Sequence, residues 1–485
     1  MAFTLPVFLC LASGFLLVSI GWQSYRSFAD RVFVGSLSAG FGLGIFSVVY
    51  FLSLLLRFTH PILVDLAVCA VLAGAFLLFR IRSAPATAGD AEQNHRQPPW
   101  LHRFATAAFA IALAGALYSA AMRVLAYPHG DGWDAFSIWN LHARFLFRGG
   151  SNWRDGFTSL IPWSHPDYPL LLPADIAHFW TYLGHDAPAV PAIIGFVLTF
   201  STVGLLFAAL SLLRGNLAAL LGATALLATP AFVELGTAQY ADVPLSFFVL
   251  ASIVLVCLYD DRPYNDQPAS DSPPAGLLVL AGFAAACAAW TKNEGLLFLC
   301  AILAARLITL TRRHGSTNWI ASGRRFLPLL IAVVPAFLLI AFFKHSIAPP
   351  GDLFSDPSTT LHKLADPARY WAITRWYFKG FFRFGRWLLV PGTILMIGFY
   401  FACGKEEHVE PQLGIRTSVL ALALTLAGYF AVYLITPYDI YWHLRFSLTR
   451  LLLQLWPSAI FLFFLLVKVS PVRDSRGATL PLPLS

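Results

Sequence analysis

The sequence predicts an all-α polytopic membrane protein with about thirteen transmembrane helices. Three observations support this prediction: 58% of the 485 residues are hydrophobic, only 12% are charged, and the mean hydropathy is +0.68. Because soluble globular proteins carry about 25% charged residues, this chain lacks the polar surface of a water-soluble fold. The composition therefore excludes soluble, fibrous and disordered classes. We interpret the formal net charge of +8 as a signal of topology and lipid contact, with no nucleic-acid partner.

Candidate spans follow from the apolar stretches, because a helix that crosses a bilayer needs about 20 mostly apolar residues. The predicted spans are 3–21, 32–56, 61–80, 103–125, 188–213, 217–233, 243–259, 275–290, 295–311, 326–345, 386–403, 415–435 and 447–467. The first has neither the basic start nor the cleavage site of a signal peptide, so we expect it to remain as a span. The short pair on either side of 291–295 is alternatively re-entrant or tilted.

Basic residues in short loops predict the orientation, because Lys and Arg in such loops stay on the cytoplasmic side. The residues that fall on one side of a thirteen-span alternation are Arg26, Arg31, Arg80, Arg82, Arg96, Arg214, Arg306, Arg312, Arg313, Arg324, Arg325, Lys405, Lys468, Arg473 and Arg476. The N-terminus is then predicted to be outside and the C-terminus inside.

Two long segments, 126–187 and 346–385, lie on the predicted outer side. They are rich in aromatic and basic residues, with Trp133, Trp139 and Trp371 among them. This combination is typical of the lipid headgroup region. We therefore expect both segments to form amphipathic juxtamembrane helices.

Two carboxylates, Asp131 and Asp134, follow the fourth span in a turn with two glycines. The apolar spacing predicts a surface helix from Asp134 to Arg148, with Asp134 at its start. Asp134 is then either a helix cap, which the local pattern favours, or a base that removes a proton from an acceptor hydroxyl. Asp131 is the alternative base.

Further along the same segment, His165, Asp167 and Tyr168 lie among prolines that force an extended, rigid turn. They are either a fixed polar group that faces a cavity or ordinary loop residues. Tyr240 and Asp242 lie between the sixth and seventh spans, where Asp242 has the position of a helix cap.

Two more charged groups lie on the same predicted side. Lys292 and Glu294 separate the eighth and ninth spans, as a structural ion pair or a substrate contact, and ionisable groups at membrane depth are usually functional. His443, Arg445 and Arg450 surround the start of the last span. Arg450 either extends to the interface or holds a phosphate. We expect all these groups to converge on one extracytoplasmic cavity.

The stretch Gly132-Trp133-Asp134-Ala135-Phe136-Ser137-Ile138-Trp139 resembles the acidic motif of the glycosyltransferase-C superfamily. These polytopic enzymes take a sugar from a polyprenyl-phosphate carrier. The layout is similar to the bacterial branch near protein O-mannosyltransferases, lipid A aminoarabinose transferase and the lipopolysaccharide-core transferases of rhizobia. Many members have Asp-Glu at this point, whereas this chain has Asp134-Ala135.

The resemblance extends to four further motifs. The stretch 165–169 is similar to a His/Lys-Pro-Pro segment, 240–244 to a second acidic motif, 291–295 to a Thr/Ala-Lys-x-x-Gly turn, and 450–457 to an Arg-rich start of the last helix.

The similarity, which runs from about 122 to 467, predicts three regions. Residues 1–100 are N-terminal spans with a cytoplasmic linker, 101–467 a catalytic module of glycosyltransferase-C type, and 468–485 a cytoplasmic tail.

The resemblance implies a multi-pass enzyme of the inner (plasma) membrane, with its site on the extracytoplasmic side. It would move a sugar, with inversion, from a polyprenyl-phosphate carrier to a hydroxyl of a lipid, glycan or protein. Asp134 would be the general base. Lys292, Arg445 and Arg450, with His165 or His443, would stabilise the departing phosphate. Membrane lipids are the other expected partners, and we expect no metal or other cofactor.

Two other classes remain open. A transporter or flippase of lipid-linked saccharides predicts polar groups along a path between both faces. A ligase or polymerase of surface polysaccharide relies on arginines and a histidine without the early acidic motif. Asp134 is therefore the residue that discriminates between the classes.

Overall fold

The computed structural model describes residues 3–58, 60–82, 99–260, 275–314, 319–354, 357–405 and 412–469. Over these ranges the chain is helical, and its only extended pairing is an isolated antiparallel bridge between Lys405 and Val467. The prediction of an all-α fold is confirmed. The linker at 83–98 and the tail from 470 on, both predicted to be cytoplasmic, lie outside the described residues.

The long helices are α1 Thr4–Gly21, α2 Phe28–Leu56, α3 Pro61–Arg82, α4 Pro99–Ala126, α7 Ala189–Arg214, α10 Asp242–Asp260, α12 Asn293–His314, α13 Trp319–Ser346, α17 Leu413–Ile435 and α18 Ile440–Leu466. The shorter helices between the long ones are α5 Asn140–Arg148, α6 Leu171–Leu183, α8 Asn216–Leu227, α9 Pro230–Thr237, α11 Gly276–Thr291, α14 Pro357–Ala365, α15 Pro367–Phe381 and α16 Gly392–Cys403.

Ten helices in the described part of the chain are long and apolar enough to cross a membrane. The number becomes eleven if α8 and α9, which are bent by 67° at their junction, form one broken span. Helices α11 and α16 have only 16 and 12 residues, or about 24 and 18 Å at 1.5 Å per residue, below the ~30 Å hydrocarbon core. The polytopic class is confirmed, and the count of thirteen is not.

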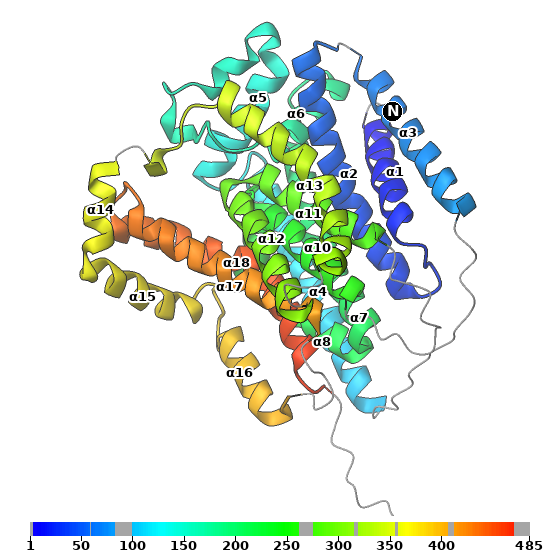
Figure 1. Cartoon of the computed structure of the whole chain (residues 1–485), viewed down its shortest axis with the longest axis vertical. Coiled ribbons are helices and arrows are strands. Elements are labelled where there is room, and N and C mark those ends of the chain that lie inside the picture. The colour runs from blue at the N-terminus through cyan, green and yellow to red at the C-terminus, as the bar shows by residue number, and fades with distance from the viewer. Residues whose placement is uncertain are drawn as a thin grey trace, which may run out of the picture.

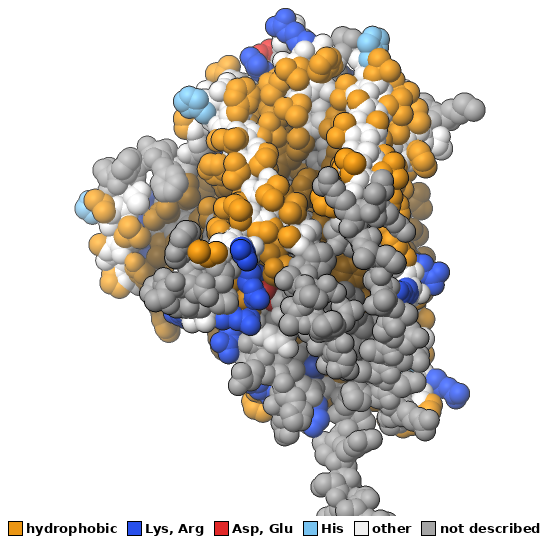
Figure 2. Space-filling model, turned by 45° about the vertical axis from the view of Figure 1, so that its right-hand side comes forward, with side chains coloured by type: hydrophobic (Ala, Val, Ile, Leu, Met, Phe, Trp, Pro, Cys, Tyr) orange, Lys and Arg blue, Asp and Glu red, His pale blue; other side chains and the backbone are white. Residues whose placement is uncertain are grey.

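Helix α10 forms the centre of the bundle, and its apolar window is entirely buried. It contacts α7, α11, α17 and α18. Figure 2 shows one face of the molecule, and hydrophobic side chains cover much of its upper part. This distribution suits a bundle whose flanks contact lipid.

Helix α2 is packed deep inside the bundle because glycines line its contacts. A methyl group on Gly42 would lie 2.1 Å from the Cys10 carbonyl oxygen of α1. A methyl group on Gly40 would meet the ring of Phe247 in α10, and one on Gly44 would lie 2.5 Å from the sulfur of Cys287 in α11. Close backbone approach through small residues is a common way to pack membrane helices. The N-terminal spans are thus in direct contact with the helices that follow.

Helix α3, in contrast, exposes most of its surface, and only 6% of its apolar window is buried. Its carboxylate Asp65 is nevertheless buried. Oδ2 of Asp65 lies 3.0 Å from Nε2 of His178 and accepts a 2.6 Å hydrogen bond from the Tyr182 hydroxyl, both on α6. A polar contact therefore attaches α3 to α6.

The two predicted juxtamembrane segments do form short helices. The first contains η1 Ala135–Trp139, α5, η2 Gly150–Phe157, η3 Pro162–Ser164 and α6, and the second contains η4 Asp352–Phe354, α14 and α15. In Figure 1, α5 and α6 lie at the end of the molecule where α1 begins, and α18 ends at the opposite end.

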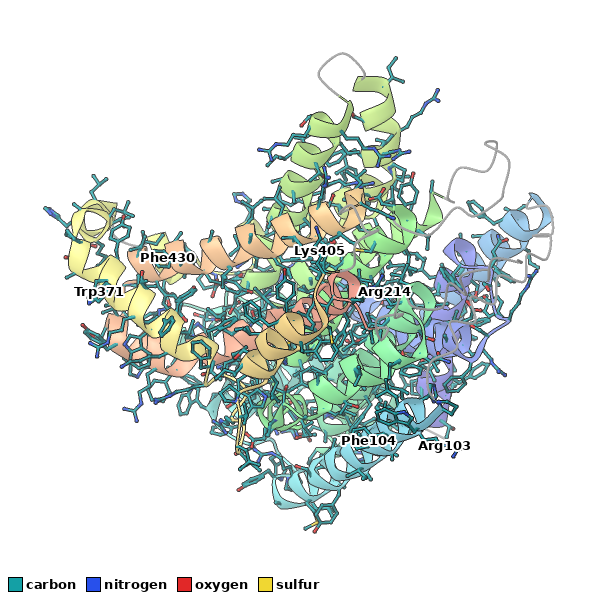
Figure 3. The ribbon with its side chains drawn as sticks, turned by 90° about the horizontal axis from the view of Figure 1, so that it is seen from below. Arg103, Phe104, Arg214, Trp371, Lys405 and Phe430 are labelled. Atoms are coloured by element: carbon teal, nitrogen blue, oxygen red, sulfur yellow. The ribbon has the colours of Figure 1, made fainter. Side chains whose placement is uncertain are left out.

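Charged residues of the predicted inner loops meet at that opposite end. The Arg214 guanidinium donates a 3.0 Å hydrogen bond to the Val467 carbonyl, and Lys405 pairs with the same residue. Figure 3 shows Arg214 and Lys405 near each other from below. Arg306 differs, because it is fully buried in an ion pair with Asp260. These contacts bring predicted inner segments together, while the side of the membrane stays a prediction.

Candidate functional site

Three charged residues from distant parts of the chain form the centre of the site. Nη2 of Arg450 in α18 donates a 2.6 Å hydrogen bond to Oδ2 of Asp134. Nε of the same guanidinium donates a 2.8 Å hydrogen bond to Oδ2 of Asp242, at the start of α10. Planar guanidinium groups suit this kind of double contact.

Lys292 extends this arrangement to five charges. Its Nζ lies 3.3 Å from Oδ1 of Asp242 and 2.8 Å from Oε1 of Glu294. Burial opposes its charge, but the two carboxylates outweigh burial, so the pKa of Lys292 lies above its ordinary value. Negative and positive groups thus alternate from Asp134 through Arg450, Asp242 and Lys292 to Glu294. We call this row the charge chain.

The backbone explains how Lys292 reaches the charge chain. Its φ of −162° and ψ of 160° break the helix between α11 and α12. Gly295 lets the two helices approach there, since a methyl group on it would lie 1.8 Å from the Ala288 carbonyl oxygen. The break between α11 and α12 therefore directs the side chain of Lys292 into the bundle.

Two glycines in a tight turn place Asp134. Gly130 and Gly132 have φ values of +94° and +99°, a region that residues with a Cβ rarely adopt. Asp134 has helical dihedral angles and its side chain makes no capping hydrogen bond. The interpretation of Asp134 as a helix cap is therefore wrong in this structure, where its carboxylate binds Arg450 instead.

A network of neutral side chains supports the charge chain at its buried member, Asp242. Nε2 of Gln454, one turn after Arg450, donates a 2.6 Å hydrogen bond to Oδ1 of Asp242. The Tyr429 hydroxyl donates to Oε1 of Gln454 at 2.8 Å. Asp242 is fully buried, and both of its oxygens are bound by side chains. Sequence reasoning did not select Gln454 or Tyr429, because a polar residue inside a span gives no signal of its partner.

Aromatic rings line the site. Tyr168 stacks with His165, at 4.7 Å between ring centroids, and with Trp139, at 5.7 Å. Nζ of Lys292 lies 5.7 Å from the Tyr168 ring centroid, and the Arg450 guanidinium lies 4.8 Å from that of Tyr240. Burial, with help from Asp134, raises the pKa of Tyr240 to about 12. Both tyrosines are therefore neutral hydrogen-bonding groups at physiological pH.

A second polar cluster lies beside the charge chain. Oδ2 of Asp167 accepts a 2.8 Å hydrogen bond from Asn293 and lies 3.2 Å from Nζ of Lys344. Lys344 also donates to Oδ1 of Asn293 at 2.7 Å. Lys344 was not selected from the sequence. The position of Lys344 could have indicated a role, because it lies at the predicted outer end of a span, where the positive-inside rule does not favour a lysine.

The two predicted histidines lie within electrostatic range of Lys292. Burial lowers the pKa of His165, against the opposing effect of Asp167. Nδ1 of His443 lies 2.9 Å from the Thr436 hydroxyl, and its ring packs against Tyr433.

Two predicted site residues lie apart from the charge chain. Asp131 pairs with Arg123 at the end of α4. Arg445 is exposed on α18, and its guanidinium lies over the ring of Phe446.

The family comparison indicates the class of protein that the chain resembles, the membrane glycosyltransferases. Residues 181–348 match the model of the family described as dolichyl-phosphate-mannose-protein mannosyltransferase, which confirms the resemblance to the glycosyltransferase-C superfamily. Searches of curated proteins and of solved structures gave no match. The matched range includes Asp242, Lys292 and Glu294, whereas Asp134 and Arg450 lie outside it.

Proposed function

We propose that the chain transfers a sugar, with inversion, from a polyprenyl-phosphate carrier to a hydroxyl group of a lipid, glycan or protein acceptor. We place the reaction on the extracytoplasmic side of the inner (plasma) membrane. The family match supports the donor class, because the family is described by a lipid-phosphate sugar donor. The positive-inside pattern supports the side.

The observation that carries the proposal is the different exposure of the two carboxylates on Arg450. The Asp242 side chain is fully buried, whereas that of Asp134 keeps 18% of its surface exposed. An acceptor hydroxyl can therefore approach Asp134 but not Asp242. We assign Asp134 as the base and Asp242 as the counter-ion that fixes Arg450.

In the proposed step, the acceptor hydroxyl transfers its proton to the Asp134 carboxylate while its oxygen bonds to the anomeric carbon. The bond from that carbon to the phosphate oxygen breaks, and its electron pair leaves with the lipid phosphate. Attack opposite the leaving group inverts the anomeric configuration. The step uses only the sugar donor and the acceptor, and it needs no other reactant.

Cations near the site would stabilise the departing phosphate. Lys292 and Arg450 are each bound to two carboxylates, so part of their charge is already compensated. Arg445 pairs with no carboxylate among the described residues, and it lies five residues before Arg450 on the same helix. We propose that Arg445, with His165 or His443 as a hydrogen-bond donor, adds the charge stabilisation that the phosphate requires.

The experiment is a transfer assay with the purified chain in lipid nanodiscs. The donors are a panel of undecaprenyl-phosphate sugars, mannose first. The acceptors are the lipopolysaccharide, glycolipid and glycoprotein fractions of cells that lack the chain, and products are followed by mass. We expect Asp134→Asn to abolish transfer and Asp131→Asn to retain it. Transfer by Asp134→Asn at the parent rate would overturn the assignment of the base, whereas no transfer by the parent with any donor of the panel would favour a ligase or transporter.

A further inference from the structure

Ser47, in the buried half of α2, makes an unusual pair of hydrogen bonds. Its hydroxyl donates to the Leu170 carbonyl at 3.3 Å and accepts from Nε1 of Trp290 at 2.9 Å. The side chain is fully buried. One hydroxyl thus connects two segments that are 120 residues apart in the sequence.

Both segments carry site residues. Leu170 follows Tyr168 by two residues, at the start of α6, and Trp290 precedes Lys292 by two residues, at the end of α11. Nζ of Lys292 lies 5.7 Å from the Tyr168 ring centroid. The hydroxyl of Ser47 therefore lies behind the two backbones whose relative position sets this contact.

Three other serines of α1 and α2 behave differently. Ser13, Ser19 and Ser53 donate to the carbonyl four residues earlier in their own helix, the usual arrangement for serine in a membrane helix. Ser47 instead bonds only to residues outside α2. Stabilisation of α2 alone does not explain why the Ser47 hydroxyl bonds to two other segments.

The surroundings of Ser47 hold its hydroxyl in place. Gly44, one turn earlier, is in contact with Cys287 of α11. Phe51, one turn later, packs its ring 5.3 Å from that of Trp290. Because Ser47 is sealed from solvent, water cannot replace its hydroxyl if the residue is changed.

We propose that Ser47 is a positioning residue for the transfer reaction. It fixes the segment that carries Tyr168 against the break that carries Lys292, so α2, which lies outside the family match, is part of the catalytic apparatus. This inference rests on the proposed function of the charge chain. It gives the N-terminal spans a defined task, because the position of the site depends on a hydroxyl that they supply.

The first test compares Ser47→Ala with Ser53→Ala in the nanodisc assay with undecaprenyl-phosphate mannose, or with whichever donor of the panel the parent uses. Ser47→Ala leaves a buried indole N–H and a buried carbonyl unpaired. Small displacements of site groups reduce rates by up to about a hundredfold. We expect kcat to fall about tenfold or more with a change in KM below about twofold. Ser53→Ala loses only a bond within α2 and should behave as the parent.

The second test measures backbone hydrogen–deuterium exchange in the full chain without substrate. We expect Ser47→Ala to accelerate exchange in both 164–172 and 289–296, and Trp290→Phe to accelerate it in 289–296 alone. Ser47→Thr, which keeps the hydroxyl, should restore slow exchange. If Ser47→Ala does not fold, Trp290→Phe decides, because it removes one bond and retains a ring.

The two tests separate the possible failures. If the parent transfers sugar and Ser47→Ala matches Ser53→Ala in kcat and in exchange, the role of Ser47 is overturned. If no donor of the panel is used by the parent, the proposed function fails, and the exchange pattern still decides whether Ser47 holds the two segments together. Faster exchange with no loss of kcat overturns the positioning role.

Discussion

Arg450 of α18 donates a 2.6 Å hydrogen bond to Asp134, although 316 residues separate the two in the sequence. The same guanidinium binds the buried carboxylate of Asp242. One cation, in the first half of α18, therefore joins the turn after α4 and the start of α10. The site is a product of the whole fold, and its parts are tested separately below.

Replacing the shared cation should destabilise the protein as well as inactivate it. Arg450→Gln leaves Asp134 without its partner and Asp242 with Lys292 as its only charged partner, and removal of one member of a buried ion pair costs about 3 kcal/mol. We expect a matching fall in the free energy of unfolding in detergent. Arg148→Ala is the control, since Arg148 is a surface partner of Asp186 and such pairs contribute about 0–1 kcal/mol. Equal stability of the two variants would contradict this role of Arg450.

Lys344 should matter for transfer more than for folding. Lys344→Met removes the cation beside Asp167 and a donor to Asn293, which frees the segment that carries Tyr168. We expect the transfer rate to fall about tenfold while the protein stays monodisperse. Lys379→Met, at an exposed position of α15, is the matched control. A parent-like rate for Lys344→Met would show that the second polar cluster is not part of the site.

The turn before Asp134 can be tested through Gly132, the second of its two glycines. Gly132→Ala places a methyl group 2.4 Å from the Tyr240 hydroxyl at a φ of +99°, so we expect Asp134 to be displaced and the transfer rate to fall at least about tenfold. Gly150 also has a positive φ, but a methyl group there meets open space. Gly150→Ala should therefore keep its rate, and equal rates for both alanine variants would argue against the displacement.

Acid should destabilise the protein through His142. Burial, followed by the positive charge of His165, lowers the pKa of His142 to about 3, whereas an unfolded histidine has a pKa near 6.5. Below pH ~6.5 the unfolded state binds the proton and the folded state does not, so stability falls as pH decreases toward 3. Between pH 7 and 5 we expect a loss of about 2 kcal/mol from this residue.

The measurement for His142 is the stability difference between pH 7 and pH 5 in detergent. His142→Gln should reduce this difference by the amount expected for the histidine, while other groups titrate equally in both proteins. An unchanged difference would mean that folding does not shift the pKa of His142.

The sequence predicted the convergence of Asp134, Asp242, Lys292, Glu294 and Arg450 because each is a rare charge at the same predicted end of the spans. A charge in an apolar chain requires a partner, so the few candidates could be expected to find each other. The same reasoning fails for Gln454, Tyr429 and Ser47. Neutral polar side chains are common inside spans and usually bond within their own helix.

The helix count and the partners of a few charged residues show a second limit of prediction from the sequence. An apolar window does not detect the bend between α8 and α9, where Pro230 begins the second helix, or the early end of α11 at the extended backbone of Lys292. Arg306 satisfies the positive-inside pattern, yet it is buried against Asp260. Asp131 and Asp134 are three residues apart, and only the turn geometry directs one to Arg123 and the other to Arg450.

The spacing of the charge chain along the sequence also determines its order of assembly during biosynthesis. Lys292 is synthesised 50 residues after Asp242, and Arg450 follows Asp134 by 316 residues, or roughly 15 to 60 s at 5–20 residues per second. Until α18 leaves the ribosome, the nascent chain carries Asp134 without this cation and Asp242 with Lys292 as its sole charged partner. Helix α18, the last helix in the described part of the chain, therefore completes the charge chain, and a polypeptide that stalls before α18 lacks its central cation.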